Sequence, residues 1–196
     1  MPRTDLSLLS YYTRKVWVFL LKIKDQTLER FKTWKILVEN QTDKKVKVLR
    51  TDNGLEFCNR EFDAYCNSQG ILRHKTVRNT PQQNGVAERM NRTLLEKVRC
   101  LLFSSGMPKS FWGEALSTAS LLINRIPSSV LNFKCPEGIW TGKKVNFEYL
   151  KVFGCEAYAH QSDGKLEPRS KKCVFVGYQE GTKGYRLWIG IQVELG

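Results

Sequence analysis

The sequence is poor in the features that build zinc sites, disulfide frameworks and membrane spans. It contains two histidines, His74 and His160, and none of its six cysteines forms a Cys-x-x-Cys pair. This spacing predicts no zinc site. The chain also has no run of about 20 apolar residues and no signal-peptide pattern at its N-terminus. We therefore expect an intracellular protein, nuclear or cytoplasmic, with reduced thiols.

Acidic residues are scarce relative to basic ones. The 196 residues include 32 Lys and Arg but 19 Asp and Glu, which gives a net charge of +13 and a pI near 9.6. This excess favours a polyanionic partner, nucleic acid first and an acidic membrane second, over a merely solubilising surface. Apolar residues make up 41%, so we expect one or two folded domains rather than a disordered chain.

The first 127 residues alternate strand and helix patterns, which is typical of an α/β domain. Short runs of β-branched and other apolar residues predict strands at 16–22, 46–50 and 71–77. Apolar residues at helical spacing predict helices over about 26–40, 62–66, 86–104 and 108–126.

The rest of the sequence predicts a linker and a small β domain. Residues 128–146 lose the periodicity and contain two glycines and a proline. Short strand patterns separated by glycine turns then follow at 150–158, 172–178 and 185–188, which is typical of a small β-barrel. The predicted domains are therefore 1–127, a linker over 128–146, and 147–196, the last one truncated.

Two acidic residues stand where metal-dependent phosphoryl transfer would need them. Asp52 follows the strand at 46–50 in the turn Thr51–Gly54, and Glu88 opens the helix at 86–104. This chemistry uses hard oxygen ligands that hold two divalent ions about 3.5–4 Å apart. We therefore predict Asp52 and Glu88 as catalytic and metal-binding residues, with Mg²⁺ as the metal and Mn²⁺ able to replace it.

Each acid also has an ordinary explanation. Asp-Asn-Gly is a common turn sequence, and the helix dipole favours a glutamate in the first turn of a helix. Only the two acids together, with Gln82–Gly85 between them, favour the metal-binding interpretation.

Basic residues follow Glu88 along the same predicted helix. Arg89 and Arg92 lie about one turn apart, and Lys97 comes further along. Such a stripe can contact nucleic-acid phosphates without reading the base sequence. For any one of these residues, an ordinary solvated helix face is an equally good explanation.

Several of these segments resemble the integrases of copia-type LTR retrotransposons. The resemblance is carried by residues 49–58, which include Asp52, by residues 79–96, which include Glu88, and by residues 150–155 and 184–188. It implies an α/β, RNase H-like mixed sheet with flanking helices, followed by a small SH3-like β-barrel. It also implies that Asp52 and Glu88 are the second and third acids of the family's metal site.

The resemblance implies a role in DNA integration, in which element DNA is processed at its 3′ ends and transferred into target DNA. The implied partners are element DNA, target DNA and other integrase chains, with no membrane. The loop at 76–84 matches a loop that helps to engage DNA in the family. The predicted nucleic-acid-binding residues are therefore Arg78, Gln82, Gln83, Asn84, Arg89, Arg92 and Lys97.

The first acid of the family pattern has no match. In the family it lies on an opening strand well upstream of the segment that resembles Thr13–Lys15, and Asp5 stands too close to Thr13 to correspond to it. We therefore expect an N-terminally truncated core whose first strand is missing, with an open slot or exposed edge in its sheet. Metal binding would then be weak or absent and catalysis impaired.

Three alternatives stay open. An active transferase could obtain its missing first acid from Asp5 or from another chain. A non-catalytic module could bind nucleic acid or chromatin through the basic helix or the barrel. The chain could also be a transposon relic without a function.

Overall fold

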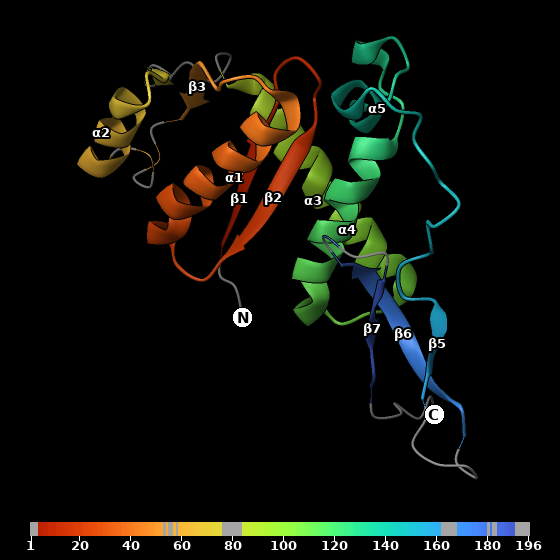
Figure 1. Ribbon diagram of the computed structural model, residues 1–196. Helices are drawn as coiled ribbons and strands as arrows, with labels where there is room; N and C mark the ends of the chain where they lie inside the picture. Colours follow the sequence, from red (N-terminus) through yellow and green to blue (C-terminus); the bar gives the residue numbers. More distant parts are fainter. Residues whose placement is uncertain are drawn as a thin grey trace. The chain divides into compact units, whose positions relative to one another are not determined.

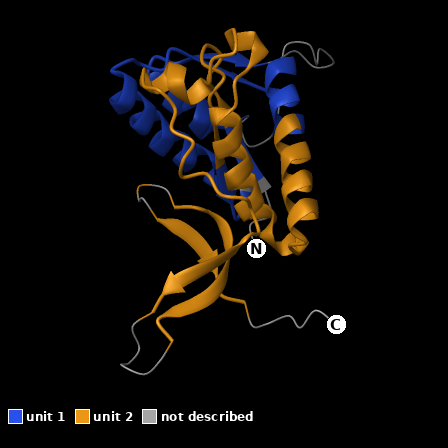
Figure 2. Cartoon of the chain, turned by 90° about the vertical axis from the view of Figure 1, so that its right-hand side faces the viewer, with its two compact units in different colours: residues 1–7, 19–92 blue, residues 8–18, 93–196 orange. Residues whose placement is uncertain are grey.

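The computed structural model describes residues 4–52, 54, 57, 59–75, 84–161, 168–179, 181 and 184–190. The chain divides into two compact units (Figure 2). Unit 1 comprises Met1–Ser7 and Phe19–Arg92, and unit 2 comprises Leu8–Val18 and Thr93–Gly196. These units differ from the domains predicted from the sequence, whose boundaries at residues 127 and 146 stay predictions.

The N-terminal strands form a hairpin that contributes to both units. β1 (Thr4–Leu9) and β2 (Val16–Leu21) make a two-stranded sheet (Figure 1). In the turn between them, the Ser10 amide donates to the Lys15 carbonyl over 2.9 Å. The strand predicted at 16–22 is confirmed, because this apolar run forms β2.

The core of unit 1 is built around α1 (Thr27–Thr42). Its apolar residues at helical spacing are buried, as the sequence predicts: Leu28, Phe31, Trp34 and Val38. The Phe31 ring lies 5.3 Å from the Phe62 ring of α2 (Arg60–Ser68). α1 also carries a buried ion pair, since Lys35 Nζ lies 2.9 Å from Glu39 Oε2 and both side chains are less than a tenth exposed.

α2 connects two short strands, so that this part of unit 1 is a β–α–β arrangement. β3 (Val48–Thr51) and β4 (Leu72–Lys75) pair in parallel, with Leu49 opposite Arg73. Asn59 caps α2 by accepting a 2.6 Å hydrogen bond from the Phe62 amide. The chain then turns at Gly70, whose φ of +66° is easily reached by glycine.

The described strands of the predicted RNase H-like sheet form two separate pairs. β1 is hydrogen-bonded to β2 and β3 to β4, and no ladder joins one pair to the other within the described residues. Val48 in β3 is 51% exposed although it is apolar. This discontinuity agrees with the predicted open slot or exposed edge in the sheet.

Unit 2 combines helices with a three-stranded sheet. Its helices are the end of α3 (Gly85–Ser105), η4 (Lys109–Phe111), α4 (Trp112–Arg125), η5 (Ser129–Leu131) and α5 (Pro136–Thr141). Its strands are β5 (Glu156–His160), β6 (Ser170–Tyr178) and β7 (Tyr185–Trp188), which are antiparallel in the order β5-β6-β7. In the described part of the chain, no helix is long and apolar enough to cross a membrane.

The three-stranded sheet packs on α4 at a glycine. A Cβ placed on Gly177 of β6 would lie 3.1 Å from the Thr118 hydroxyl, so the strand approaches the helix closely at this glycine. The strand predicted at 150–158 begins only at Glu156. Residues before it form a turn instead, in which the Cys155 amide donates to the Val152 carbonyl over 3.1 Å.

Side chains also fix the start of β2 within unit 2. Asn124 of α4 both accepts from the Val16 amide (2.8 Å) and donates to the Val16 carbonyl (2.7 Å). Lys15 forms an ion pair with Glu137 of α5 over 2.8 Å. The predicted linker at 128–146 therefore contains a short helix that packs against the hairpin.

Candidate metal and nucleic-acid site

Asp52 lies directly after the C-terminal end of β3. Thr51, the last residue of the strand, is buried, and Asp52 is exposed. Its Oδ1 accepts a 3.0 Å hydrogen bond from the Gly54 amide, which is the side-chain-to-backbone turn expected of an Asp-x-Gly sequence. This bond engages one carboxylate oxygen of a solvent-exposed side chain.

Glu88 lies in the first turn of α3 and is exposed. Its amide donates to the Asn84 carbonyl over 3.1 Å as the helix begins. The N-terminal end of a helix carries unpaired N–H groups and a partial positive charge, which are favourable for a carboxylate. Glu88 is therefore an accessible acid at a helix start, where it can meet a cation from solvent.

The chemistry of these two donors suits a hard divalent cation. Mg²⁺ commonly binds one or two carboxylates and keeps several waters, and Asp52 and Glu88 are both exposed residues of unit 1. Within the described ranges, no three His, Cys, Asp or Glu side chains form a group that could hold a metal ion. The joint role of Asp52 and Glu88 as a metal site thus stays a prediction.

One alternative requires Asp5 as the missing first acid. It lies on β1, and burial raises the pKa of its carboxyl above the ordinary 3.8, against a hydrogen bond from its own backbone that lowers it. The described residues do not bring Asp5 into a metal-binding group with Asp52 and Glu88. Asp5 therefore gains no support as the missing ligand.

The predicted phosphate-contacting residues on α3 face solvent. Arg89 and Arg92 are exposed, and Lys97 is partly exposed. The Arg89 side chain runs back to the start of the helix. Its Nη1 lies 3.3 Å from where a Cβ on Gly85 would be. Asn84 directly precedes α3 and is partly buried.

Three predicted nucleic-acid-binding residues lie outside the described part of the chain: Arg78, Gln82 and Gln83.

Two described polar residues nearby were not predicted. The Ser7 hydroxyl on β1 donates to Asn91 Oδ1 on α3 over 2.7 Å, a contact within unit 1. It connects the first strand to the helix that carries Glu88.

Arg73 is a residue of this region that sequence reasoning missed. It lies on β4, yet its guanidinium is buried against the connection between β3 and α2. Nη2 donates to Thr51 Oγ1 (3.0 Å) and to the Phe57 carbonyl (2.9 Å), and Nη1 donates to Asp63 Oδ1 (3.1 Å). No spacing in the sequence signals these contacts, since each partner lies at least ten residues away.

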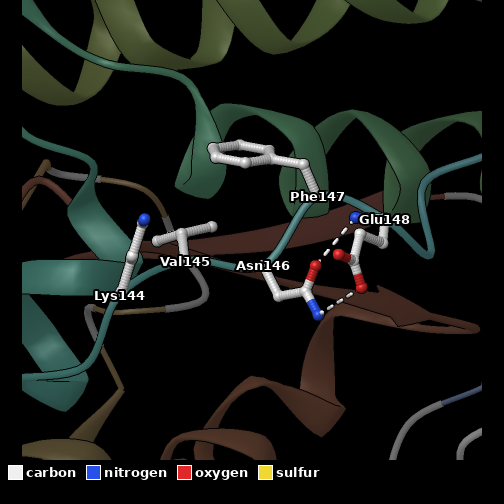
Figure 3. Close-up of a pocket in the computed structure, with 5 residues that line it drawn as sticks. All are labelled: Lys144, Val145, Asn146, Phe147 and Glu148. Atoms are coloured by element: carbon white, nitrogen blue, oxygen red, sulfur yellow. Dashed lines mark hydrogen bonds between the residues drawn. The ribbon is translucent and has the colours of Figure 1, made fainter.

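A hollow of about 370 Å³ lies beside the segment that precedes the SH3-like strands (Figure 3). Five consecutive residues line it: Lys144, Val145, Asn146, Phe147 and Glu148. Its polar groups bond to each other, since Asn146 Oδ1 accepts from the Glu148 amide over 2.8 Å. Among the described residues, only this one segment lines the hollow, and the hollow contains neither Asp52 nor Glu88.

The chain matches a known domain family and is similar in sequence to a known polyprotein. Residues 155–192 match the family described as the retroviral polymerase SH3-like domain. The chain is 54% identical over 179 residues to the Retrovirus-related Pol polyprotein from transposon TNT 1-94 of Nicotiana tabacum. That match covers 90% of this chain and 14% of the polyprotein, so the chain spans about one seventh of its relative's length.

The fold resembles that of retroviral integrases. A chain in the cryoEM structure of the simian T-cell lymphotropic virus intasome in complex with PP2A regulatory subunit B56 gamma gives a TM-score of 0.57 at 14% identity, over 94% of this chain and 69% of that one. The HTLV-2 integrase catalytic core domain in complex with magnesium, in its trimeric form, gives 0.50 at 20% identity, over 67% of this chain and 80% of that one. These likenesses confirm the predicted fold class.

Sequence and fold therefore lead to the same family. The polyprotein match covers nearly the whole chain, the structural neighbours are integrases, and the SH3-like match covers the C-terminal strands. The chain belongs to the Pol polyproteins of copia-type retrotransposons, has a fold that resembles integrase cores, and matches the retroviral SH3-like domain over residues 155–192.

Proposed function

We propose that the chain acts in DNA integration as part of an integrase that binds element DNA and target DNA, and that it is catalytically impaired by itself. One observation carries the proposal. Asp52 follows a parallel strand and Glu88 opens a helix of the same unit, in a fold that resembles an integrase core solved with magnesium. Open α/β sheets bind ligands at the carboxyl ends of their strands.

The proposed site divides the work between two kinds of side chain. Asp52 and Glu88 would hold Mg²⁺ or Mn²⁺, and such an ion would supply neutralisation of charge on the oxygens of a phosphodiester. Arg89 and Arg92 contact DNA phosphates and orient the strand for in-line attack by a 3′ hydroxyl. The other proposed DNA contacts are Arg78, Gln82, Gln83, Asn84 and Lys97.

The impairment follows from the number of acids. Two carboxylates without a third hold a divalent ion weakly and position it poorly, because no further ligand fixes its geometry. The described residues offer no group of three donors. Other integrase chains are proposed partners, and an acid from one of them could complete the site.

A strand-transfer assay with short DNA duplexes and Mg²⁺ or Mn²⁺ tests this proposal. We expect the chain to bind DNA, to take up Mn²⁺ weakly through Asp52, and to transfer little or no DNA. Asp52→Asn should remove Mn²⁺ uptake, whereas Asp43→Asn, which changes an exposed acid in the turn after α1, should not. Robust transfer that Asp52→Asn abolishes would refute the impairment.

A second function is a non-catalytic module that binds nucleic acid or chromatin. The exposed basic residues at the start of α3 favour it, since phosphate contacts need no metal. It predicts that Glu88→Gln leaves DNA affinity and its salt dependence unchanged, with or without Mn²⁺. A Mn²⁺-dependent gain in DNA affinity that Glu88→Gln removes would exclude this alternative.

A further inference from the structure

Arg73 connects both sides of the turn that carries Asp52. Thr51 precedes Asp52 and Phe57 lies beyond it, and one guanidinium nitrogen, Nη2, donates to both. Within the turn, Asp52 Oδ1 accepts from the Gly54 amide, and the Phe57 amide donates to the Gly54 carbonyl over 3.0 Å. The planar guanidinium holds its donors in a fixed geometry, so these contacts fix the width of the turn.

The same side chain anchors the turn to the rest of unit 1. Nη1 is ion-paired with Asp63 of α2 over 3.1 Å, and the guanidinium carbon lies 4.7 Å from the centre of the Phe62 ring. Its side chain is 7% exposed. Since Arg73 stands in the β4 ladder opposite Leu49 of β3, it fixes the turn to β4 and, through Asp63 and Phe62, to α2.

Burying an arginine at this position costs more folding free energy than burying an apolar side chain. Desolvation of the cation costs free energy that an apolar side chain would not, and Arg73 Nε is buried with no hydrogen-bond partner among the residues described. What the arginine adds over an apolar residue is the set of directed bonds to Thr51, Phe57 and Asp63. The bonds to Thr51 and Phe57 hold the two sides of the turn that carries Asp52, and the bond to Asp63 ties them to α2.

We propose that Arg73 is a positioning residue for Asp52, which holds the turn after β3 so that the carboxylate is preorganised for a divalent cation. This inference rests on the proposed metal role of Asp52. A positioning role and a purely electrostatic role of Arg73 predict opposite changes in metal affinity when the side chain is removed. A guanidinium near a cation site repels the metal, so loss of its charge alone would strengthen metal binding, whereas loss of the turn geometry would weaken it.

The experiment uses the full chain with Arg73→Met, which keeps a long unbranched side chain but removes the guanidinium with its charge and donors. Mn²⁺ affinity is measured by titration, and exchange of the Gly54 amide is followed by nuclear magnetic resonance. We expect Mn²⁺ affinity to fall by about tenfold, as for loss of a residue that orients a metal ligand. We also expect the Gly54 amide to exchange faster, because its hydrogen bond to Asp52 opens more often.

The matched control is Arg30→Met, which removes the same charge from an exposed position on α1 in unit 1. It should change neither measurement. Equal effects of Arg30→Met and Arg73→Met would show that net charge alone matters and would overturn the inference. Stronger Mn²⁺ binding by Arg73→Met, or unchanged Gly54 exchange, would overturn it too.

Two substitutions at Thr51 keep the test decisive if Arg73→Met fails to fold. Thr51→Val preserves the shape of the side chain but removes the acceptor for Arg73, and Thr51→Ser preserves the acceptor but removes a methyl group. The inference predicts that Thr51→Val weakens Mn²⁺ binding and speeds Gly54 exchange, while Thr51→Ser retains both. The reverse order would assign the effect to packing and contradict a role for the hydrogen bond.

The proposed function and this inference can fail separately. No Mn²⁺ uptake by the unaltered chain would refute the metal role of Asp52, and Gly54 exchange would still decide whether Arg73 holds the turn. Mn²⁺ uptake that Asp52→Asn removes and Arg73→Met leaves intact would support the metal role and refute the positioning role.

Discussion

The strand pair β3–β4 in unit 1 and the sheet β5–β6–β7 in unit 2 are stabilised in different ways. In β6, Cys173, Phe175 and Val176 are buried, and the sheet packs on α4. In β4, no residue reaches full burial, and its most enclosed side chain is the charged Arg73. Apolar packing therefore dominates the SH3-like sheet, whereas directed polar bonds hold the parallel pair.

This difference matters because the candidate metal ligand Asp52 follows the polar pair. Apolar burial is non-directional, whereas a hydrogen bond requires a defined distance and angle between donor and acceptor. In this pair, Val48 is 51% exposed and Leu72 is 58% exposed, so the two strands bury little apolar surface. We infer that the parallel pair before Asp52 is less stable than the SH3-like sheet. The predictions below separate the two regions.

The largest effect is expected in the apolar region. Phe175→Ala removes a 1% exposed ring that lies 5.1 Å from the Tyr178 ring and 5.6 Å from the Tyr185 ring. It should cost about 3–5 kcal/mol of unfolding free energy. Amide exchange should accelerate in β5–β7 and stay unchanged in β3–β4. Tyr158→Ala, at a 64% exposed position on β5, is the control and should have little effect. Equal acceleration in both sheets would contradict separate stabilisation.

A smaller effect is expected from the buried ion pair in unit 1. Burial tends to raise the pKa of Glu39, but hydrogen bonds from the Val46 amide and from Lys35 outweigh it and leave this pKa below its ordinary 4.5. Ionised Glu39 therefore stabilises the fold above pH 4.5, and this contribution is lost as the pH falls through the lowered pKa. Glu39→Gln should cost about 1–3 kcal/mol near neutral pH.

Urea unfolding at several pH values checks this prediction. The difference in unfolding free energy between the unaltered chain and Glu39→Gln should shrink as the pH drops below 4.5, because a protonated Glu39 is uncharged, like the glutamine of the variant. Glu29→Gln, at an exposed acid on the same helix, should show no such trend. A difference that stays constant with pH would contradict the stabilising charge on Glu39.

The smallest effect is expected at the proposed DNA surface. Arg92→Gln should leave the fold intact, weaken DNA binding uniformly across sequences and reduce the slope of log affinity against log salt by about 1. Fluorescence anisotropy at several salt concentrations measures this slope. Arg30→Gln on α1 removes the same charge elsewhere in unit 1 and should leave the slope unchanged. Identical slopes for both variants would argue against a phosphate contact at Arg92.

Local patterns were enough to predict much of the fold. The apolar run at 16–22 and the helical spacing around Phe31 predicted β2 and α1, and the Asp-Asn-Gly sequence predicted the turn at Asp52. The strand predicted at 150–158 was partly wrong, because a turn at Val152–Cys155 delays β5 to Glu156.

Contacts between distant residues could not be predicted in the same way. The Arg73 guanidinium meets Thr51 and Phe57 only because β3 and β4 pair in parallel with α2 between them. Similarly, Asn124 bonds to Val16 across 108 positions, which no local pattern reveals. The sequence resemblance identified the two acids, but the support around Asp52 became visible only in three dimensions.

The central claim is that Asp52 and Glu88 share one divalent ion. The most direct test is paramagnetic broadening by Mn²⁺ in the full, ¹⁵N-labelled chain. We predict that the amide signals of Asp52, Gly54 and Glu88 broaden together in a single titration step, and that Asp52→Asn suppresses the broadening at Glu88. Broadening at only one of the two acids, or at neither, would contradict the claim.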